Sequence, residues 1–124
     1  MNWTDLALFK GIDLNDSFVM GWSFDNNRLS FKLEASIWPE SEYYLEPKKE
    51  EYTCYRKAVL EFVGVHKVSG LPPIDSVLSS TDPDGSVDYG NVDDFIVGDG
   101  TFIVSGDFGT VSIIGGELRF EVNT

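Results

Sequence analysis

Hydrophobic and polar side chains alternate along residues 18–24 and again along residues 29–37. A period of two is typical of β-strands that bury one face. Between the two runs, Asn26 and Asn27 can adopt the positive φ angles of a two-residue hairpin turn. The sequence therefore predicts a hairpin with one apolar face. The predicted pairs are Phe24 with Leu29, Trp22 with Phe31 and Met20 with Leu33.

Shorter alternating runs occupy residues 95–122, separated by turns that contain glycine. The turns fall at residues 98–100, at residues 106–109 and at Gly115-Gly116. Short strands with glycine turns between them are typical of an antiparallel meander. The predicted pairs are Val104 with Val111, Phe102 with Ile113, Ile113 with Leu118 and Val111 with Phe120.

The rest of the chain predicts one more long strand and a short helix. Residues 53–68 are apolar at alternate positions and then on both faces, which predicts a central strand or one bent at Gly64. Residues 3–10 predict a helix of about two turns that ends at Gly11. We therefore expect one all-β domain with minor α content over residues 1–124. The two predicted hairpin systems favour an antiparallel β-sandwich or a partly open β-barrel, with a short N-terminal helix.

The charge of the chain is strongly acidic and unevenly distributed. Nine Lys and Arg residues are outnumbered by 21 Asp and Glu residues, which gives a net charge of −12. Residues 75–124 carry ten acidic side chains and one basic one, Arg119, and so contribute −9. Such a field repels nucleic-acid phosphates and anionic membranes, and it attracts cationic proteins. We expect a basic protein partner and no nucleic-acid or membrane partner, unless the acidity serves only solubility.

Several features bear on location and chemistry. No apolar run approaches the roughly 18 residues of a membrane-spanning helix, and the first residues lack a secretory signal pattern. The single cysteine, Cys54, cannot form an internal disulfide, which predicts a cytoplasmic protein with a buried thiol. His66 is the only histidine, whereas imidazole metal sites usually use two or three. We therefore expect no cofactor and no enzymatic activity.

An acidic stretch around residues 82–88 has two interpretations. Asp82, Asp84 and Asp88 could supply carboxylate oxygens to a calcium ion. The glycine at position 85, however, comes two residues earlier than in the helix–loop–helix calcium pattern, and no matching Glu follows. Asp-Pro-Asp-Gly is also a common turn sequence, because proline presets φ and glycine closes the turn.

Residues 39–51 form a predicted loop, since they are polar and contain two prolines. Aromatic and acidic side chains are mixed there, a composition found at protein recognition surfaces. The same aromatic residues could instead form a lid packed over one end of the sheet. The candidate binding residues are Trp38, Glu40, Glu42, Tyr43, Tyr44, Glu46 and Tyr52.

Two segments carry a resemblance to known proteins. They read EASIWPESEYYLEP, at residues 34–47, and CYRKAVLEF, at residues 54–62. The chain resembles small uncharacterised bacterial proteins of about this length, some of which act as immunity partners of secreted toxins. The resemblance implies a bacterial cytoplasmic setting and assigns no functional residue.

Three functional hypotheses follow. The leading one is a non-enzymatic protein-interaction module that binds its partner through an acidic surface, with toxin neutralisation as one version. The second is a small-molecule-binding β-barrel with an apolar interior. The third is an enzyme that uses Asp and Glu carboxylates. A homodimer formed through an exposed strand edge is compatible with all three.

Overall fold

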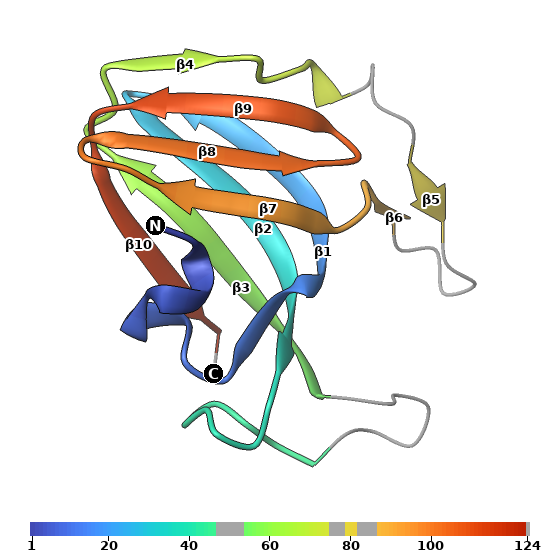
Figure 1. Ribbon diagram of the computed structural model, residues 1–124. Coiled ribbons are helices and arrows are strands. Elements are labelled where there is room, and N and C mark those ends of the chain that lie inside the picture. Colours follow the sequence, from blue (N-terminus) through green and yellow to red (C-terminus); the bar gives the residue numbers. More distant parts are fainter. Residues whose placement is uncertain (47–53, 75–78, 82–86, 124) are drawn as a thin grey trace.

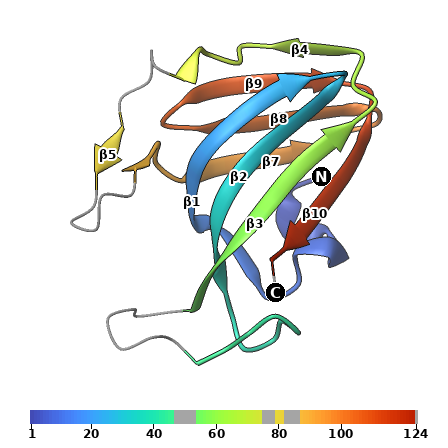
Figure 2. The same cartoon turned by 180° about the vertical axis from the view of Figure 1, so that it is seen from behind.

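In the computed structural model, two antiparallel sheets of four strands each pack face to face (Figures 1 and 2). The structure describes residues 1–46, 54–74, 79–81 and 87–123. Sheet I has the order β1 (Ile12–Asp25), β2 (Arg28–Ile37), β3 (Cys54–Val63) and β10 (Glu117–Val122). Sheet II has the order β4 (Lys67–Ser69), β9 (Gly109–Ile114), β8 (Thr101–Gly106) and β7 (Val92–Val97). A small ribbon pairs β5 (Ser80–Thr81) with β6 (Val87–Asp88).

This arrangement is an all-β sandwich, as the alternating pattern predicts. Over the described residues the two sheets are not closed into a barrel, so the sandwich is the correct alternative. None of the described helices is long and apolar enough to cross a membrane.

The hairpin of β1 and β2 forms around the predicted turn. Asn26 and Asn27 have φ angles of 51° and 60°, the left-handed values that a two-residue turn of this kind requires. The predicted pairs Phe24–Leu29 and Trp22–Phe31 are confirmed.

The third predicted pair of this hairpin is wrong. Leu33 lies opposite Val19 instead of Met20, because the register shifts between Val19 and Gly21. An extra residue in one strand reverses the alternation of the residues beyond it. Val19 is consequently fully buried, whereas Met20 is only partly buried.

The C-terminal strands divide between the two sheets. The pairs Val104–Val111 and Phe102–Ile113 between β8 and β9 are confirmed. The predicted pairing of β9 with β10 is wrong, because β10 pairs with β3. Gly115 and Gly116 have φ angles of 77° and 101°, and here the chain leaves sheet II and crosses to sheet I. The residues of β10 that face the core are therefore Leu118, Phe120 and Val122, which lie opposite Phe62, Leu60 and Ala58.

The predicted bend at Gly64 is confirmed. Strand β3 is an inner strand of sheet I and ends at Val63. The chain then enters sheet II as β4. This crossing lies beside the one between β9 and β10, since the His66 N–H donates to the Ile114 carbonyl at 2.8 Å. Both passages between the sheets thus occur at one corner of the sandwich.

The predicted N-terminal helix is wrong as an α-helix. Two 3-10 turns replace it, η1 (Trp3–Asp5) and η2 (Ala7–Phe9). The Asn2 side chain caps η1 by accepting a hydrogen bond from the Thr4 N–H at 3.3 Å. A segment this short gains its stability from docking, and Trp3 and Phe9 are buried in the core.

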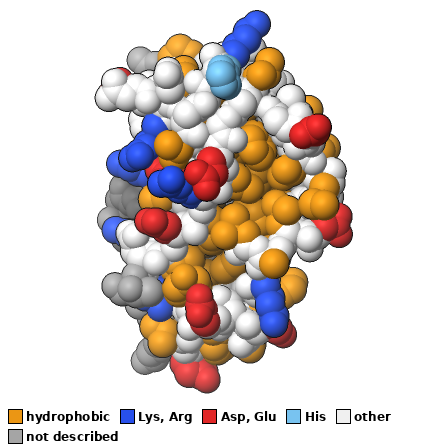
Figure 3. Space-filling model, turned by 90° about the vertical axis from the view of Figure 1, so that its left-hand side faces the viewer, with side chains coloured by type: hydrophobic (Ala, Val, Ile, Leu, Met, Phe, Trp, Pro, Cys, Tyr) orange, Lys and Arg blue, Asp and Glu red, His pale blue; other side chains and the backbone are white. Residues whose placement is uncertain are grey.

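Packed aromatic rings fill the space between the sheets. Phe62 of sheet I lies 4.9 Å from Phe102 and 5.9 Å from Phe95, both of sheet II, measured between ring centroids. Phe31 contacts Phe108 at 5.8 Å in the same way. Figure 3 shows the side of the molecule along which β10 runs, where hydrophobic side chains also gather at the surface.

Candidate functional site

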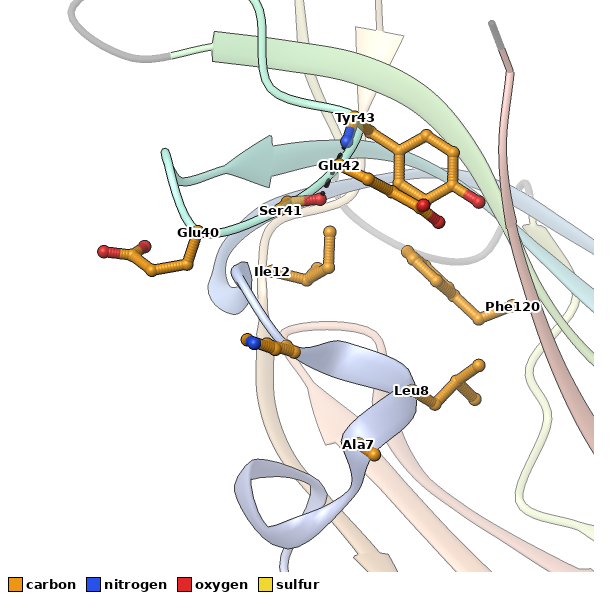
Figure 4. Close-up of a pocket in the computed structure, with 9 residues that line it drawn as sticks. Ala7, Leu8, Ile12, Glu40, Ser41, Glu42, Tyr43 and Phe120 are labelled. Carbon is orange, nitrogen blue, oxygen red and sulfur yellow. Dashed lines mark hydrogen bonds between the residues drawn. The ribbon is translucent and has the colours of Figure 1, made fainter.

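A pocket of about 300 Å³ lies between η2, the loop after β2, and β10 (Figure 4). Leu8, Ile12 and Phe120 point into it from η2, β1 and β10, respectively. Glu42 and Tyr43 lie side by side at its other wall, whereas Glu40 points away on the outer rim. The complete lining consists of Ala7, Leu8, Lys10, Ile12, Glu40, Ser41, Glu42, Tyr43 and Phe120.

The backbone of the loop after β2 is fixed against the start of β1. The Trp38 N–H donates to the Gly11 carbonyl at 2.7 Å, and the Ser41 N–H donates to the Trp38 carbonyl at 3.0 Å. The Ser41 hydroxyl then accepts from the Tyr43 N–H at 3.1 Å. Gly11 has a φ of 74°, and a Cβ at this position would lie only 2.5 Å from the Ser41 nitrogen. The wall of the pocket therefore depends on a close backbone contact that needs glycine.

Arg56 connects the same loop to the end of β10. Its Nη1 donates to the Tyr43 carbonyl at 3.1 Å, and its Nη2 donates to the Asn123 carbonyl at 3.0 Å. The guanidinium thus holds two sides of the pocket in fixed relation.

The candidate binding residues separate into two groups in the structure. Tyr43 and Tyr44 pack partly against the core, as the lid interpretation predicts. Trp38 has 48% of its surface exposed, as the recognition interpretation predicts. Glu40, Glu42 and Glu46 are exposed as well, and of these Glu40 and Glu42 reach the pocket. Tyr52 lies outside the described residues.

Of the three candidate calcium ligands, only Asp88 is among the residues that the structure describes. Asp82 and Asp84 lie outside the described residues. The Asp88 carboxylate accepts a hydrogen bond from the Gly90 N–H at 3.0 Å, which is a local turn contact. Among the described residues, no group of three or more His, Cys, Asp or Glu side chains is placed to hold a metal ion.

The other potentially reactive side chains lie away from the pocket. Cys54 is buried, with 4% of its surface exposed, as predicted. His66 is exposed at the corner where the chain passes between the sheets. The pocket itself therefore offers apolar contact, two carboxylates and the Lys10 ammonium, which suit binding.

Sequence reasoning missed the pocket residues outside the loop, namely Leu8, Lys10, Ile12 and Phe120. The alternating pattern correctly places Phe120 on the apolar face of its strand, but it predicts the wrong neighbouring strand. Only the pairing of β10 with β3 brings Phe120 near η2, where its ring lies 5.1 Å from that of Phe9. The carboxylates of the pocket also precede residue 75, so the acidic C-terminal segment does not supply them.

A second hollow of about 320 Å³ lies on the outer face of sheet I. Met20, Val59, Lys32 and Lys57 line it together with Glu34. None of the candidate binding residues from the loop reaches this hollow, so the pocket beside the loop remains the candidate site.

No protein-family model matches the chain, and the comparisons with curated proteins and with solved structures give no match either.

Proposed function

We propose that the protein is a non-catalytic module that binds another protein, and that the partner docks at the pocket beside the loop after β2. One observation carries this proposal: exposed Glu40 and Glu42 line a pocket with apolar walls, and exposed Trp38 precedes them in the same loop. Interfaces typically combine a buried apolar anchor with a polar rim, and tryptophan is among the residues that contribute most to their affinity.

The pocket indicates the chemistry of the partner. An apolar side chain would insert between Leu8, Ile12 and Phe120, and a neighbouring Lys or Arg would face Glu42 and Glu40. The volume of about 300 Å³ is at the lower end of the range for small-molecule sites, roughly 300–1,000 Å³. Its size therefore suits one inserted side chain of a protein better than a drug-sized ligand.

The net charge of −12 supports a basic partner, because long-range attraction accelerates the encounter of oppositely charged proteins. Neutralisation of a basic toxin in the bacterial cytoplasm is one version of this function, consistent with the sequence resemblance. The proposal needs no catalytic group, metal or cofactor.

Charge reversal at the pocket tests this function. The protein is immobilised, a bound partner is isolated and identified, and its affinity is then measured by calorimetry. We expect Glu40→Lys with Glu42→Lys to weaken binding by about tenfold or more, because attraction becomes repulsion at the contact. In roughly 0.5 M salt, where the screening length is about 4 Å, wild-type binding should also weaken.

The matched control is Asp94→Lys with Asp99→Lys, which changes the net charge equally at exposed positions outside the pocket. This control should retain most of the affinity. Equal losses in both double variants would show that only total charge matters, and would overturn the assignment of the site.

A further inference from the structure

We infer that the protein forms a homodimer in which β10 of one copy pairs antiparallel with β10 of a second copy, around a twofold axis at Phe120. Strand β10 is at the edge of sheet I, with β3 as its neighbour on one side. Among the described residues, no backbone group pairs with its other side. An unpaired edge of this kind is a template for a further strand.

The hydrogen-bond ladder identifies which backbone groups of β10 point outward. The Asn123 N–H donates to the Lys57 carbonyl at 2.8 Å, at the end of the β3–β10 ladder. Bonded positions alternate along an antiparallel pair, so every second residue back from Asn123 is bonded to β3. The N–H and C=O groups of Leu118, Phe120 and Val122 therefore point away from the sheet.

Two of the other three sheet edges are partly occupied. Strand β1 is bonded at Val19, whose N–H donates to the Gly90 carbonyl and whose C=O accepts from Tyr89, each at 2.8 Å. Strand β7 pairs at Val97 with Met1 in both directions, at 2.7 and 2.8 Å. Strand β4 is only three residues long. Strand β10 is thus the most accessible edge, and it contains neither proline nor lysine, the residues that commonly protect edges.

The charges along β10 favour one register. Glu117, Arg119 and Glu121 share its outer face, and opposite charges across a strand pair are favourable. With Phe120 opposite Phe120 of the second copy, Arg119 faces Glu121 of the second copy, and the symmetry repeats this contact. The three outward backbone positions are then all paired, because Leu118 lies opposite Val122.

The neighbouring symmetric registers are less favourable. Centring on Arg119 places two arginines opposite each other and Glu117 opposite Glu121, while centring on Glu121 places two glutamates together. Centring on Leu118 pairs Phe120 with Gly116, whose φ of 101° is not that of a strand. The register centred on Phe120 alone satisfies both the charges and the backbone.

The surface beside β10 is also suited to burial. Leu118 and Phe120 are only half-buried in the single chain, although they face the core. Hydrophobic side chains also gather at the surface on this side of the molecule (Figure 3). The existing Arg119–Glu117 contact, at 3.4 Å between largely exposed side chains, is weak and easily rearranged.

Charge reversals test the dimer by analytical ultracentrifugation. Wild-type protein should sediment as a dimer. Arg119→Glu and Glu121→Arg should each raise the dissociation constant by about tenfold or more, because like charges then meet twice. The double variant Arg119→Glu with Glu121→Arg should restore the dimer. Glu117→Arg is the matched control, since position 117 lies opposite Asn123 in this register, and it should leave the dimer intact.

A monomeric wild-type protein overturns the inference, and so does a double variant that stays monomeric while its melting temperature equals that of wild type. Arg119 lies opposite Glu61 of β3, so the melting temperature of each variant is measured to separate folding from association. The Glu40→Lys, Glu42→Lys protein should remain dimeric, which keeps this test independent of the proposed partner site.

Disulfide trapping tests the register itself. In a Cys54→Ala background, Arg119→Cys chains mixed with Glu121→Cys chains of different mass should form a mixed disulfide on mild oxidation. Non-bonded pairs have Cα atoms roughly 4.5 Å apart, within the range of about 4.4–6.8 Å for a disulfide. Cross-linking of Arg119→Cys chains to one another, without the mixed product, would contradict the register centred on Phe120.

Discussion

At the scale of single residues, the sandwich depends most on rings that reach from one sheet to the other. Phe62 is fully buried, and its ring contacts Phe95 and Phe102 across the interior. We expect Phe62→Ala to lower the free energy of unfolding by about 3–5 kcal/mol, since it removes buried area and leaves a cavity. Urea denaturation followed by circular dichroism measures this loss.

The control for that substitution is Phe24→Ala, which removes the same atoms from a side chain that is 44% exposed. It should cost about 1 kcal/mol or less, because a partly exposed ring loses little burial. Similar losses in the two variants would show that the core is not centred on Phe62.

The sequence indicates the environment of some individual residues better than that of others. Of the candidate binding residues in the loop at residues 39–51, Glu40, Glu42 and Tyr43 line the pocket. The sequence does not show that Tyr43 packs against the core while Trp38 is exposed. A loop has no regular repeat of side-chain directions, so the spacing of its residues does not tell buried positions from exposed ones. The predicted position of Met20 is wrong for a different reason: one extra residue in β1 reverses the alternation beyond it.

At the scale of elements, the loop after β2 is held by its contact with Gly11. Gly11→Ala would introduce a Cβ 2.5 Å from the Ser41 nitrogen and place alanine at a φ of 74°. The left-handed conformation alone costs about 1–2 kcal/mol, and displacement of the loop adds to this cost. We therefore expect lower stability together with a change in the fluorescence of Trp38, measured after Trp3 and Trp22 are replaced by Phe.

Gly100→Ala separates the two effects of that substitution. Gly100 has nearly the same φ, 73°, but a Cβ there would meet no atom within 4 Å. It should show the conformational cost without the change in fluorescence. If both alanine variants lose the same stability and leave Trp38 unchanged, the Gly11 contact does not hold the loop.

The strands themselves were largely predictable, whereas their neighbours were less so. Alternation placed Leu118 and Phe120 correctly on the core-facing side of β10. It could not choose between β9 and β3 as the neighbour, because both pairings turn the same side chains inward. The deciding factor is the backbone path through Gly115 and Gly116, which takes the chain out of sheet II.

At the scale of the whole molecule, sheet I is complete only when β10, from the C-terminal end of the chain, pairs with β3. Removal of residues 117–124 would expose the β3 edge and uncover Phe62 and Leu60, which face Leu118 and Phe120. We expect the shortened chain to lose its cooperative unfolding transition and its near-ultraviolet circular dichroism. A synthetic peptide of residues 117–123 added to it should restore both. A shortened chain that unfolds cooperatively without the peptide would show that β10 is dispensable.

The fold class and the charge of the molecule were accessible from the sequence, because both are sums over many residues. The order of strands was not, since it depends on contacts between distant segments. The distribution of charge shows the same limit. Five of the nine basic side chains, Arg28, Lys32, Arg56, Lys57 and Arg119, belong to sheet I although they are scattered along the chain.

Strand β10 is the last strand to be synthesised, and this order affects how the protein folds during translation. Strand β3 leaves the ribosome while the strands of sheet II are still being synthesised. Until β10 follows, the edge of β3 that will pair with β10 has no neighbouring strand. A nascent chain in this state can pair with another copy or aggregate. We expect chaperones that shield exposed strands to bind it until residues 117–122 have left the ribosome and closed the sheet.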